Sequence, residues 1–291
     1  MKRLDKTEII FKILSYAILT VFAICCLYPF IFILSASISS KSSVDAGKII
    51  LWPIFDQNGP NFAAYIKVFT DKMFWISYCN SFFVTMYGTL VSMLVAICGA
   101  YALSKTRLLF GRGFNFMLVF TMWFNAGMIP TYKNFLNFGV NNIYMFIIAL
   151  GFNAFNIILL RNYFSSIPTE IEEAATIDGA TEFQILSRIY VPMSKSSIVT
   201  VAMFYAVSRW NGYLWAQMLL VPEDHPLTVY IRITVEKLIS ILDQGGGQNI
   251  DYSLNALRYA FIVCSIVPII IIYPKLQKYF AAGVNVGGVK E

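Results

Sequence analysis

Long runs without Asp, Glu, Lys or Arg dominate this chain, and short charged segments separate them. Each run is long enough for the roughly 20 apolar residues that an α-helix needs to cross a bilayer. The runs, of which the last two contain one arginine each, cover residues 13–40, 73–104, 113–132, 134–160, 196–221 and about 255–273. The arginines are Arg209 inside the fifth run and Arg258 near one end of the sixth. The pattern predicts six membrane-spanning helices.

Composition agrees with this pattern. Hydrophobic residues make up 58% of the chain and charged residues 13%, and the mean hydropathy is +0.65, which is typical of membrane proteins. Basic residues precede the first run, as they do in a secretory signal peptide. The run is longer than the 7 to 15 apolar residues of a signal peptide, so we expect an uncleaved first helix.

The placement of Lys and Arg predicts the orientation in the membrane. Six spans put both termini on one side, together with the loops at residues 105–112 and 161–195. Lys and Arg outside the spans are more frequent on this side than on the other, and positive loops stay in the cytoplasm. We therefore expect both termini to be cytoplasmic. This topology explains the net charge of +6, and we expect no nucleic-acid partner because a soluble basic face is lacking.

The loop between the fourth and fifth runs contains signals for two short helices. Thr169 with Glu172 three residues later fits a capping box, and Gly179 can adopt the left-handed conformation that ends a helix. A second helix from about Thr181 would be interrupted at Pro192. It would carry three large side chains on one face, those of Phe183, Leu186 and Tyr190. The prediction is a helix-turn-helix elbow.

The same loop carries a spaced motif. Glu-Ala-Ala at 173–175 is followed by three residues and Gly179, then by nine residues and Ile-Tyr-Val-Pro at 189–192. This spacing resembles the Glu-Ala-Ala motif of permease subunits of bacterial ATP-binding-cassette (ABC) importers, with Val191 where that motif has Leu. The resemblance implies coupling to an ATPase through residues 163–195. The coupling residues would be Glu172, Glu173, Ala174, Ala175, Asp178, Gly179, Ala180, Phe183, Leu186, Ile189 and Pro192.

The chemistry of the motif suits such a contact. Small alanines at 174, 175 and 180 would allow close backbone approach to a groove on another protein. The acids Glu172, Glu173 and Asp178 would stay in water or meet basic residues.

The resemblance also implies a whole architecture. It predicts an all-α, polytopic membrane protein of the type I ABC importer fold, with one transmembrane domain over residues 1–291, six transmembrane helices, a cytoplasmic helix-turn-helix coupling loop and a cytoplasmic tail at 275–291. Such a chain lies in the lipid of the bacterial cytoplasmic membrane. Its partners would be a second homologous permease, two cytoplasmic ABC ATPases and an extracytoplasmic sugar-binding protein.

ATP chemistry is expected elsewhere. No G-x-x-x-x-G-K-[ST] phosphate loop occurs in the sequence, so ATP and Mg should bind to the partner ATPase. The sequence also has no Ser-His-Asp set, metal-ligand spacing or paired carboxylates in a span. We therefore expect a transport subunit that is not an enzyme and has no cofactor or metal of its own. His225, the one histidine, is expected in a solvated turn.

Softer motifs resemble carbohydrate importers of the maltose-transporter type. Gly-Met-Ile-Pro-Thr-Tyr at 127–132 is similar to a stretch of a branch associated with oligosaccharides from complex polysaccharides. Trp210-Asn211 matches a pair typical of these permeases. Gly212 and Ala216 depart from the acid and the Trp-Pro that often follow this pair, so the identity of the sugar does not transfer.

Arg209 is the costliest residue for a membrane interior, since it lies near the centre of the fifth run. Helical spacing would place it in one stripe with Tyr205, Tyr213 and Gln217. This stripe and the adjacent Asn211 form the predicted substrate path, which consists of Tyr205, Arg209, Asn211, Tyr213 and Gln217. Guanidinium geometry suits sugar hydroxyls or a uronate carboxylate. The other interpretation is that Arg209 bonds backbone carbonyls or the partner permease and only fixes packing.

Three alternative functions stay open. The sequence permits an importer of a non-sugar solute, an ion-coupled secondary transporter, and a membrane anchor or sensor without transport. Secondary transporters usually place acids inside their spans, and none of the six runs contains Asp or Glu. This observation favours the ATP-driven importer.

Overall fold

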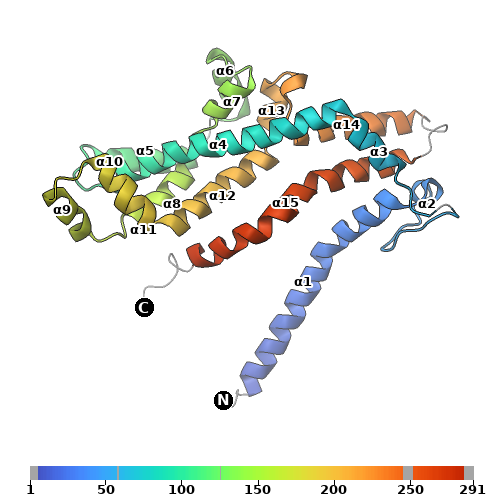
Figure 1. Ribbon diagram of the computed structural model, residues 1–291, viewed down its shortest axis with the longest axis horizontal. Helices are drawn as coiled ribbons and strands as arrows, with labels where there is room; N and C mark the ends of the chain where they lie inside the picture. Colours follow the sequence, from blue (N-terminus) through green and yellow to red (C-terminus); the bar gives the residue numbers. More distant parts are fainter. Residues whose placement is uncertain (1–5, 58, 125, 245–251, 285–291) are drawn as a thin grey trace. The chain divides into compact units, whose positions relative to one another are not determined.

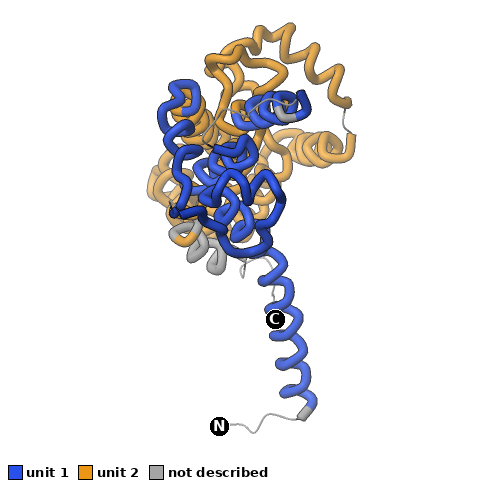
Figure 2. The backbone as a smooth tube through the Cα atoms, turned by 90° about the vertical axis from the view of Figure 1, so that its right-hand side faces the viewer, with its two compact units in different colours: residues 1–74, 231–267 blue, residues 75–230, 268–291 orange. Residues whose placement is uncertain are grey.

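The structure is a computed structural model that describes residues 6–57, 59–124, 126–244 and 252–284. This part of the chain is helical, with no strand and one isolated bridge between Asp56 and Gly59. It divides into two compact units (Figure 2). Unit 1 comprises Met1–Phe74 and Ile231–Val267, and unit 2 comprises Trp75–Tyr230 and Pro268–Glu291.

Figure 1 labels the helices in chain order. Those within unit 1 are α1 (Lys6–Ile38), α2 (Lys41–Asp45) and α3 (Ala63–Thr70). Those within unit 2 are α5 (Gly111–Trp123), α6 (Met128–Asn137), α7 (Ile143–Ala149), α8 (Ala154–Phe164), α9 (Thr169–Ile177), α10 (Glu182–Ile185), the π-helix η1 (Leu186–Tyr190), α11 (Val191–Met193), α12 (Lys195–Asn211), α13 (Leu214–Leu219) and the 3₁₀-helix η2 (Pro222–Asp224). Three helices contribute to both units: α4 (Lys72–Ser104), α14 (Leu227–Asp243) and α15 (Leu254–Val284).

Three of the described helices are long and apolar enough to cross a bilayer. They are Thr7–Ile38 in α1, Lys72–Ser104 and Leu254–Ile272 in α15, and they coincide with the first, second and sixth uncharged runs. A fourth candidate consists of α7 and α8 together, which meet at a bend of 52°. The third, fourth and fifth runs are therefore apolar as predicted, but none of them is one continuous helix.

The helices of the third and fourth runs end or begin at glycine and asparagine residues. These residues carry no charge, so they do not interrupt an uncharged run in the sequence. Gly127 has a φ of 90° before α6, and Gly139 has a φ of 69° after it, conformations that glycine adopts without strain. Asn142 and Asn153 cap α7 and α8 by accepting backbone N–H groups. Each cap starts a new helix inside the fourth run.

Hydroxyl groups tie the end of α1 to the following segment of unit 1. Ser39 Oγ donates to the Ser35 carbonyl at 2.6 Å and accepts the amide of Ile54 at 3.1 Å. Ser253 Oγ donates to Asp45 at 2.5 Å, which joins the start of α15 to α2. These buried polar groups have partners, as burial requires.

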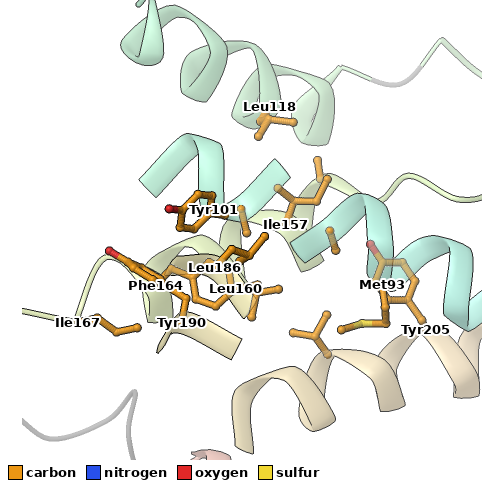
Figure 3. Packing of buried hydrophobic residues seen from close by; sticks show 14 of the residues in the cluster. Met93, Tyr101, Leu118, Ile157, Leu160, Phe164, Ile167, Leu186, Tyr190 and Tyr205 are labelled. Atoms are coloured by element: carbon orange, nitrogen blue, oxygen red, sulfur yellow. The ribbon is translucent and has the colours of Figure 1, made fainter. Parts of the chain in front are cut away.

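Unit 2 has one apolar core, to which α4, α8, α12 and the segment from α10 to η1 all contribute (Figure 3). Leu160, Phe164 and Ile185 are at most 1% exposed. The rings of Phe164 and Tyr190 meet edge to face, with centroids 5.5 Å apart. Because Ile185 and Tyr190 belong to this core, the second half of the elbow is anchored by apolar packing.

Candidate functional site

The predicted elbow is present in unit 2. Helix α9 ends at Ile177, Gly179 has a φ of 80°, and α10 begins after Thr181. A Cβ would strain this left-handed backbone, so glycine is the residue that fits the turn. Thr181 and Gln184 form a reciprocal capping box at the start of α10. The turn and the second cap hold the two short helices as separate elements.

The start of the elbow differs from the prediction. Thr169 lies within α9, whose N-cap position is held by Pro168 without a side-chain hydrogen bond. The expected capping box of Thr169 and Glu172 is therefore wrong. Glu172 is instead engaged by basic and aromatic residues outside α9.

The second helix also differs in two details. Phe183 is 76% exposed, because Ile185 takes the core position beside Leu186 and Tyr190. Pro192 does not interrupt the helical path, which passes through η1 into α11 and then breaks at Ser194. Pro192 has no backbone N–H to donate to the preceding turn, and that turn is the π-helix η1 rather than a regular α-helix.

Lys105, directly after α4, meets Glu172 of the elbow. Its Nζ lies 2.5 Å from Glu172 Oε2, and 4.0 and 3.9 Å from the ring centroids of Tyr101 and Tyr190. Tyr190 Oη donates to the same carboxylate oxygen at 2.7 Å. The ammonium thus has a carboxylate and two aromatic rings around it, and both charged side chains are largely buried.

Arg107 extends these contacts to the second helix of the elbow. Its Nη2 lies 3.2 Å from Glu172 Oε1 and also pairs with Glu182 Oε1. Tyr101 Oη donates to Glu182 Oε2 at 2.7 Å. Arg107 and Glu182 are more than half exposed, so their pair contributes no more than about 1 kcal/mol. We call Tyr101, Lys105, Arg107, Glu172, Glu182 and Tyr190 the elbow network.

The charges of the network shift the pKa values of its members. Burial raises the pKa of Glu172, but the hydrogen bonds from Lys105 and Tyr190 and the two positive charges outweigh this and hold it below its ordinary value. Burial lowers the pKa of Lys105 more than Glu172 raises it. Burial and the Glu172 carboxylate both raise the pKa of Tyr190, which stays a neutral donor. The network therefore stabilises the ionised carboxylate at neutral pH.

Helix α9 depends on this network because it has little apolar packing. None of its residues is buried. A cavity of about 800 Å³ lies beside it, and its walls include Glu172 of α9, Ser104 at the end of α4 and Lys105. Ile177 at the end of α9 is 86% exposed, and Phe183 in α10 is also mostly exposed. Of the other motif residues, the exposed ones are Glu173, Ala174, Asp178 and Pro192, and the half-buried ones are Ala175, Ala180 and Ile189.

A second candidate site is a cavity of about 440 Å³ in unit 2, which we call the α12 cavity. Of the predicted substrate stripe, Tyr205, Arg209, Asn211 and Tyr213 line this cavity, and Gln217 does not. The stripe assumed one continuous helix, whereas α12 ends at Asn211 and α13 begins at Leu214. The extended backbone of Gly212 between them breaks the helical register, so the alignment of Gln217 with Arg209 is wrong.

Arg209 is 7% exposed and bonds backbone carbonyls, as one interpretation of the sequence held. Its Nη2 donates to the carbonyls of Leu150 at 2.5 Å and Ile147 at 3.2 Å, and lies 3.1 Å from Ser92 Oγ. These carbonyls belong to the C-terminal end of α7, where a cation is favoured. Arg209 also lines the α12 cavity. The residue therefore both bonds the end of α7 and borders a cavity.

Sequence reasoning missed several residues of both sites. Lys105 and Arg107 lie in the loop at residues 105–112, where the sequence assigned charge only to the orientation in the membrane, and no motif singled out Tyr101. The α12 cavity is also lined by Asn153 and Trp215, which no motif singled out. Only the fold brings these distant segments together.

The prediction for His225 is wrong. The residue is 8% exposed rather than solvated, and its Nε2 lies 3.1 Å from the Leu220 carbonyl. Burial lowers its pKa. Among the residues that the structure describes, no group of three or more His, Cys, Asp or Glu side chains could hold a metal ion. The residues of the predicted tail at 285–291 lie outside that part of the chain.

Comparisons with known proteins give the class. Residues 2–286 match the family described as binding-protein-dependent transport system inner membrane component, and the chain belongs to this family. It is thus an inner-membrane transport subunit, as the spaced motif predicted, and this family of permease subunits is not a family of enzymes.

Two relatives and one solved structure are similar over nearly the whole chain. The polygalacturonan/rhamnogalacturonan transport system permease protein YtcP of Bacillus subtilis is 36% identical, covering 97% of this chain and 98% of its own. The arabinooligosaccharides transport system permease protein AraQ of Halalkalibacterium halodurans is 29% identical, covering 92% of each chain. A chain of a bacterial ABC transporter that imports the acidic polysaccharide alginate has a TM-score of 0.85 at 43% identity, covering 96% of this chain and 100% of that one.

Replacing Glu172 by Gln should release α9. The substitution keeps the shape of the side chain but leaves Lys105 without its counter-charge, a loss of about 1–3 kcal/mol for a largely buried group. Amides of α9 should then exchange with solvent roughly 10-fold faster or more, measured by hydrogen exchange with mass spectrometry. Glu173→Gln is the matched control, because Glu173 is exposed and should leave the exchange unchanged. Equal exchange in both variants would contradict the anchoring role.

The ion pair of Lys105 and Glu172 should weaken at acidic pH, because the carboxylate becomes protonated. The pKa of Glu172 is lowered in the folded chain, so its contribution is present above its unfolded value of about 4.3 and is lost as the pH falls through the folded value. Protection factors of α9 amides should therefore fall in the acidic range below about pH 4.3. Glu172→Gln should remove this acid step, and its persistence in the variant would assign the step to another group.

Proposed function

We propose that this chain is the permease subunit of an ATP-driven importer whose cargo is an oligosaccharide that carries carboxylates. The observation that carries the proposal is the 43% identity and TM-score of 0.85 to a chain of the alginate importer over nearly the whole sequence. A relative named for polygalacturonan, which is also a polymer of uronic acids, supports the same cargo class. AraQ shows that neutral sugars also occur among relatives, so the cargo class needs a direct test.

The chain would cross the cytoplasmic membrane six times with both termini in the cytoplasm. Three long helices, the bent pair of α7 and α8, and the helices of the third and fifth runs supply apolar segments for six crossings. Broken helices are tolerated at membrane depth where they are buried in protein or line a water-filled cavity. The excess of Lys and Arg on the side of the termini supports this orientation.

The elbow at 163–195 would transmit the movement of a partner ATPase. It exposes Ile177 at the end of α9 and Phe183 in α10, and these two apolar side chains would contact the ATPase. Glu172 and Glu182 of the elbow bind Lys105 and Tyr101 at the end of α4. A force on the exposed surface would therefore reach a membrane helix through Lys105 and Glu172.

The remaining partners follow from the family. Its description as a binding-protein-dependent system supports an extracytoplasmic sugar-binding protein that delivers the cargo. A second homologous permease would complete the pathway, two ABC ATPases would bind ATP and Mg, and the tail at 275–291 would lie on the cytoplasmic side near them.

ATP hydrolysis by the assembled complex tests the proposed function. The chain would be co-purified with its partner permease and ATPase in lipid nanodiscs and mixed with the binding protein. Oligomers of uronic acids should stimulate hydrolysis more than neutral arabino-oligosaccharides of equal length. Failure of any ATPase to co-purify, or hydrolysis indifferent to every sugar, would contradict an importer of this class.

Replacing Gly179 by Val should uncouple the complex. A β-branched residue at a φ of 80° is strained by about 1–2 kcal/mol and would alter the turn between α9 and α10. Sugar uptake into proteoliposomes should fall severalfold more than ATP hydrolysis. Gly139→Val is the matched control, because Gly139 has a φ of 69° and, like Gly179, open space around its Cβ position, but lies outside the elbow. Equal effects of the two variants on coupling would refute the lever role of this turn.

A further inference from the structure

The α12 cavity has an unbalanced charge. Arg209 is the charged residue among its lining side chains, and it is 7% exposed. No Asp or Glu lines the cavity, and no ion pair of Arg209 occurs in the part of the chain that the structure describes. A buried cation without an anion is costly, so the cavity favours an anionic occupant.

Neutral oxygens hold the guanidinium group but leave it incompletely satisfied. The carbonyls of Ile147 and Leu150 and the hydroxyl of Ser92 all contact Nη2, whereas Nη1 is buried without a hydrogen-bond partner in the described residues. A Cβ on Gly88 would lie 3.1 Å from Arg209 Nε, so the α4 backbone closes another side. The charge is thus fixed in position but not neutralised.

The other lining residues suit a sugar ring. Tyr205, Tyr213 and Trp215 offer aromatic surface, and Asn153 and Asn211 offer amides that can donate to and accept from hydroxyl groups. A volume of about 440 Å³ lies within the range of small-ligand sites, roughly 300–1,000 Å³. Apolar faces, amides and one fixed cation together match a sugar ring with a carboxylate.

We propose that the α12 cavity is a subsite for one uronate residue of the transported oligosaccharide, with Arg209 as the counter-charge of the carboxylate. This inference rests on the proposed import of oligosaccharides and adds where in the permease an acidic sugar is selected. The break at Gly212 between α12 and α13 is then functional, because it turns Tyr213 and Trp215 to the same cavity as Arg209.

Asn153→Asp tests the subsite without removing Arg209. Asn153 lines the cavity and caps α8 through its side-chain oxygen, a role that Asp fills equally well. The new carboxylate would repel a uronate and neutralise Arg209. Uptake of oligogalacturonate into proteoliposomes should fall about 10-fold or more relative to uptake of its neutral methyl ester. The binding protein is the same in both assays, so its own preference cancels in the comparison of variants.

Asn142→Asp is the matched control. Asn142 caps α7 by accepting two backbone amides but does not line the cavity, so the uptake ratio should stay that of the wild type. If the wild type carries only the charged oligomer, Asn153→Asp should lose that uptake while Asn142→Asp keeps it. Arg209→Gln should reduce the same ratio in a complex that still assembles.

The possible failures are distinguishable. If the wild-type complex responds to no sugar, charged or neutral, the proposed function fails and the subsite fails with it. If the wild type imports sugars and Asn153→Asp leaves the ratio of charged to neutral uptake unchanged, the subsite is wrong and the importer function stands.

Discussion

The ion pair of Lys105 and Glu172 is the contact on which the first helix of the elbow depends. It connects α9, a helix with no buried residue of its own, to the end of a long membrane helix. Tyr101 and Tyr190 enclose the pair, so its charges interact in a partly dry environment rather than in bulk water. This polar contact holds α9 to the end of α4, while Ile177 and Phe183 of the elbow stay exposed.

Arg209 places a different constraint on the interior of unit 2. A buried guanidinium needs acceptors, and the broken pair of α7 and α8 supplies them from carbonyls that a continuous helix would use itself. The break frees carbonyl oxygens that accept hydrogen bonds from the guanidinium group, and these hydrogen bonds in turn hold the end of α7. Leu150 and Arg209 both line the α12 cavity, so the groups that satisfy the buried charge also form part of its wall.

The two sites differ in how far residue patterns reveal them. Spacing in the sequence predicted the two helices and the glycine turn of the elbow, because capping and left-handed glycine are local effects. It did not predict that Glu172, expected in a capping box, instead pairs with Lys105, which lies 67 residues away. The exposure of Phe183 and the burial of His225 were also missed, because burial depends on which elements pack together.

The sequence by itself determined the membrane class, the apolar runs, the elbow and its spaced motif, since these rest on composition and on neighbours within a few turns. Only the tertiary structure decided where the apolar runs break and which residues surround Arg209 and Lys105. The physical reason is that uncharged caps such as Asn142 and Asn153 do not interrupt an apolar run, and long-range partners carry no local signal.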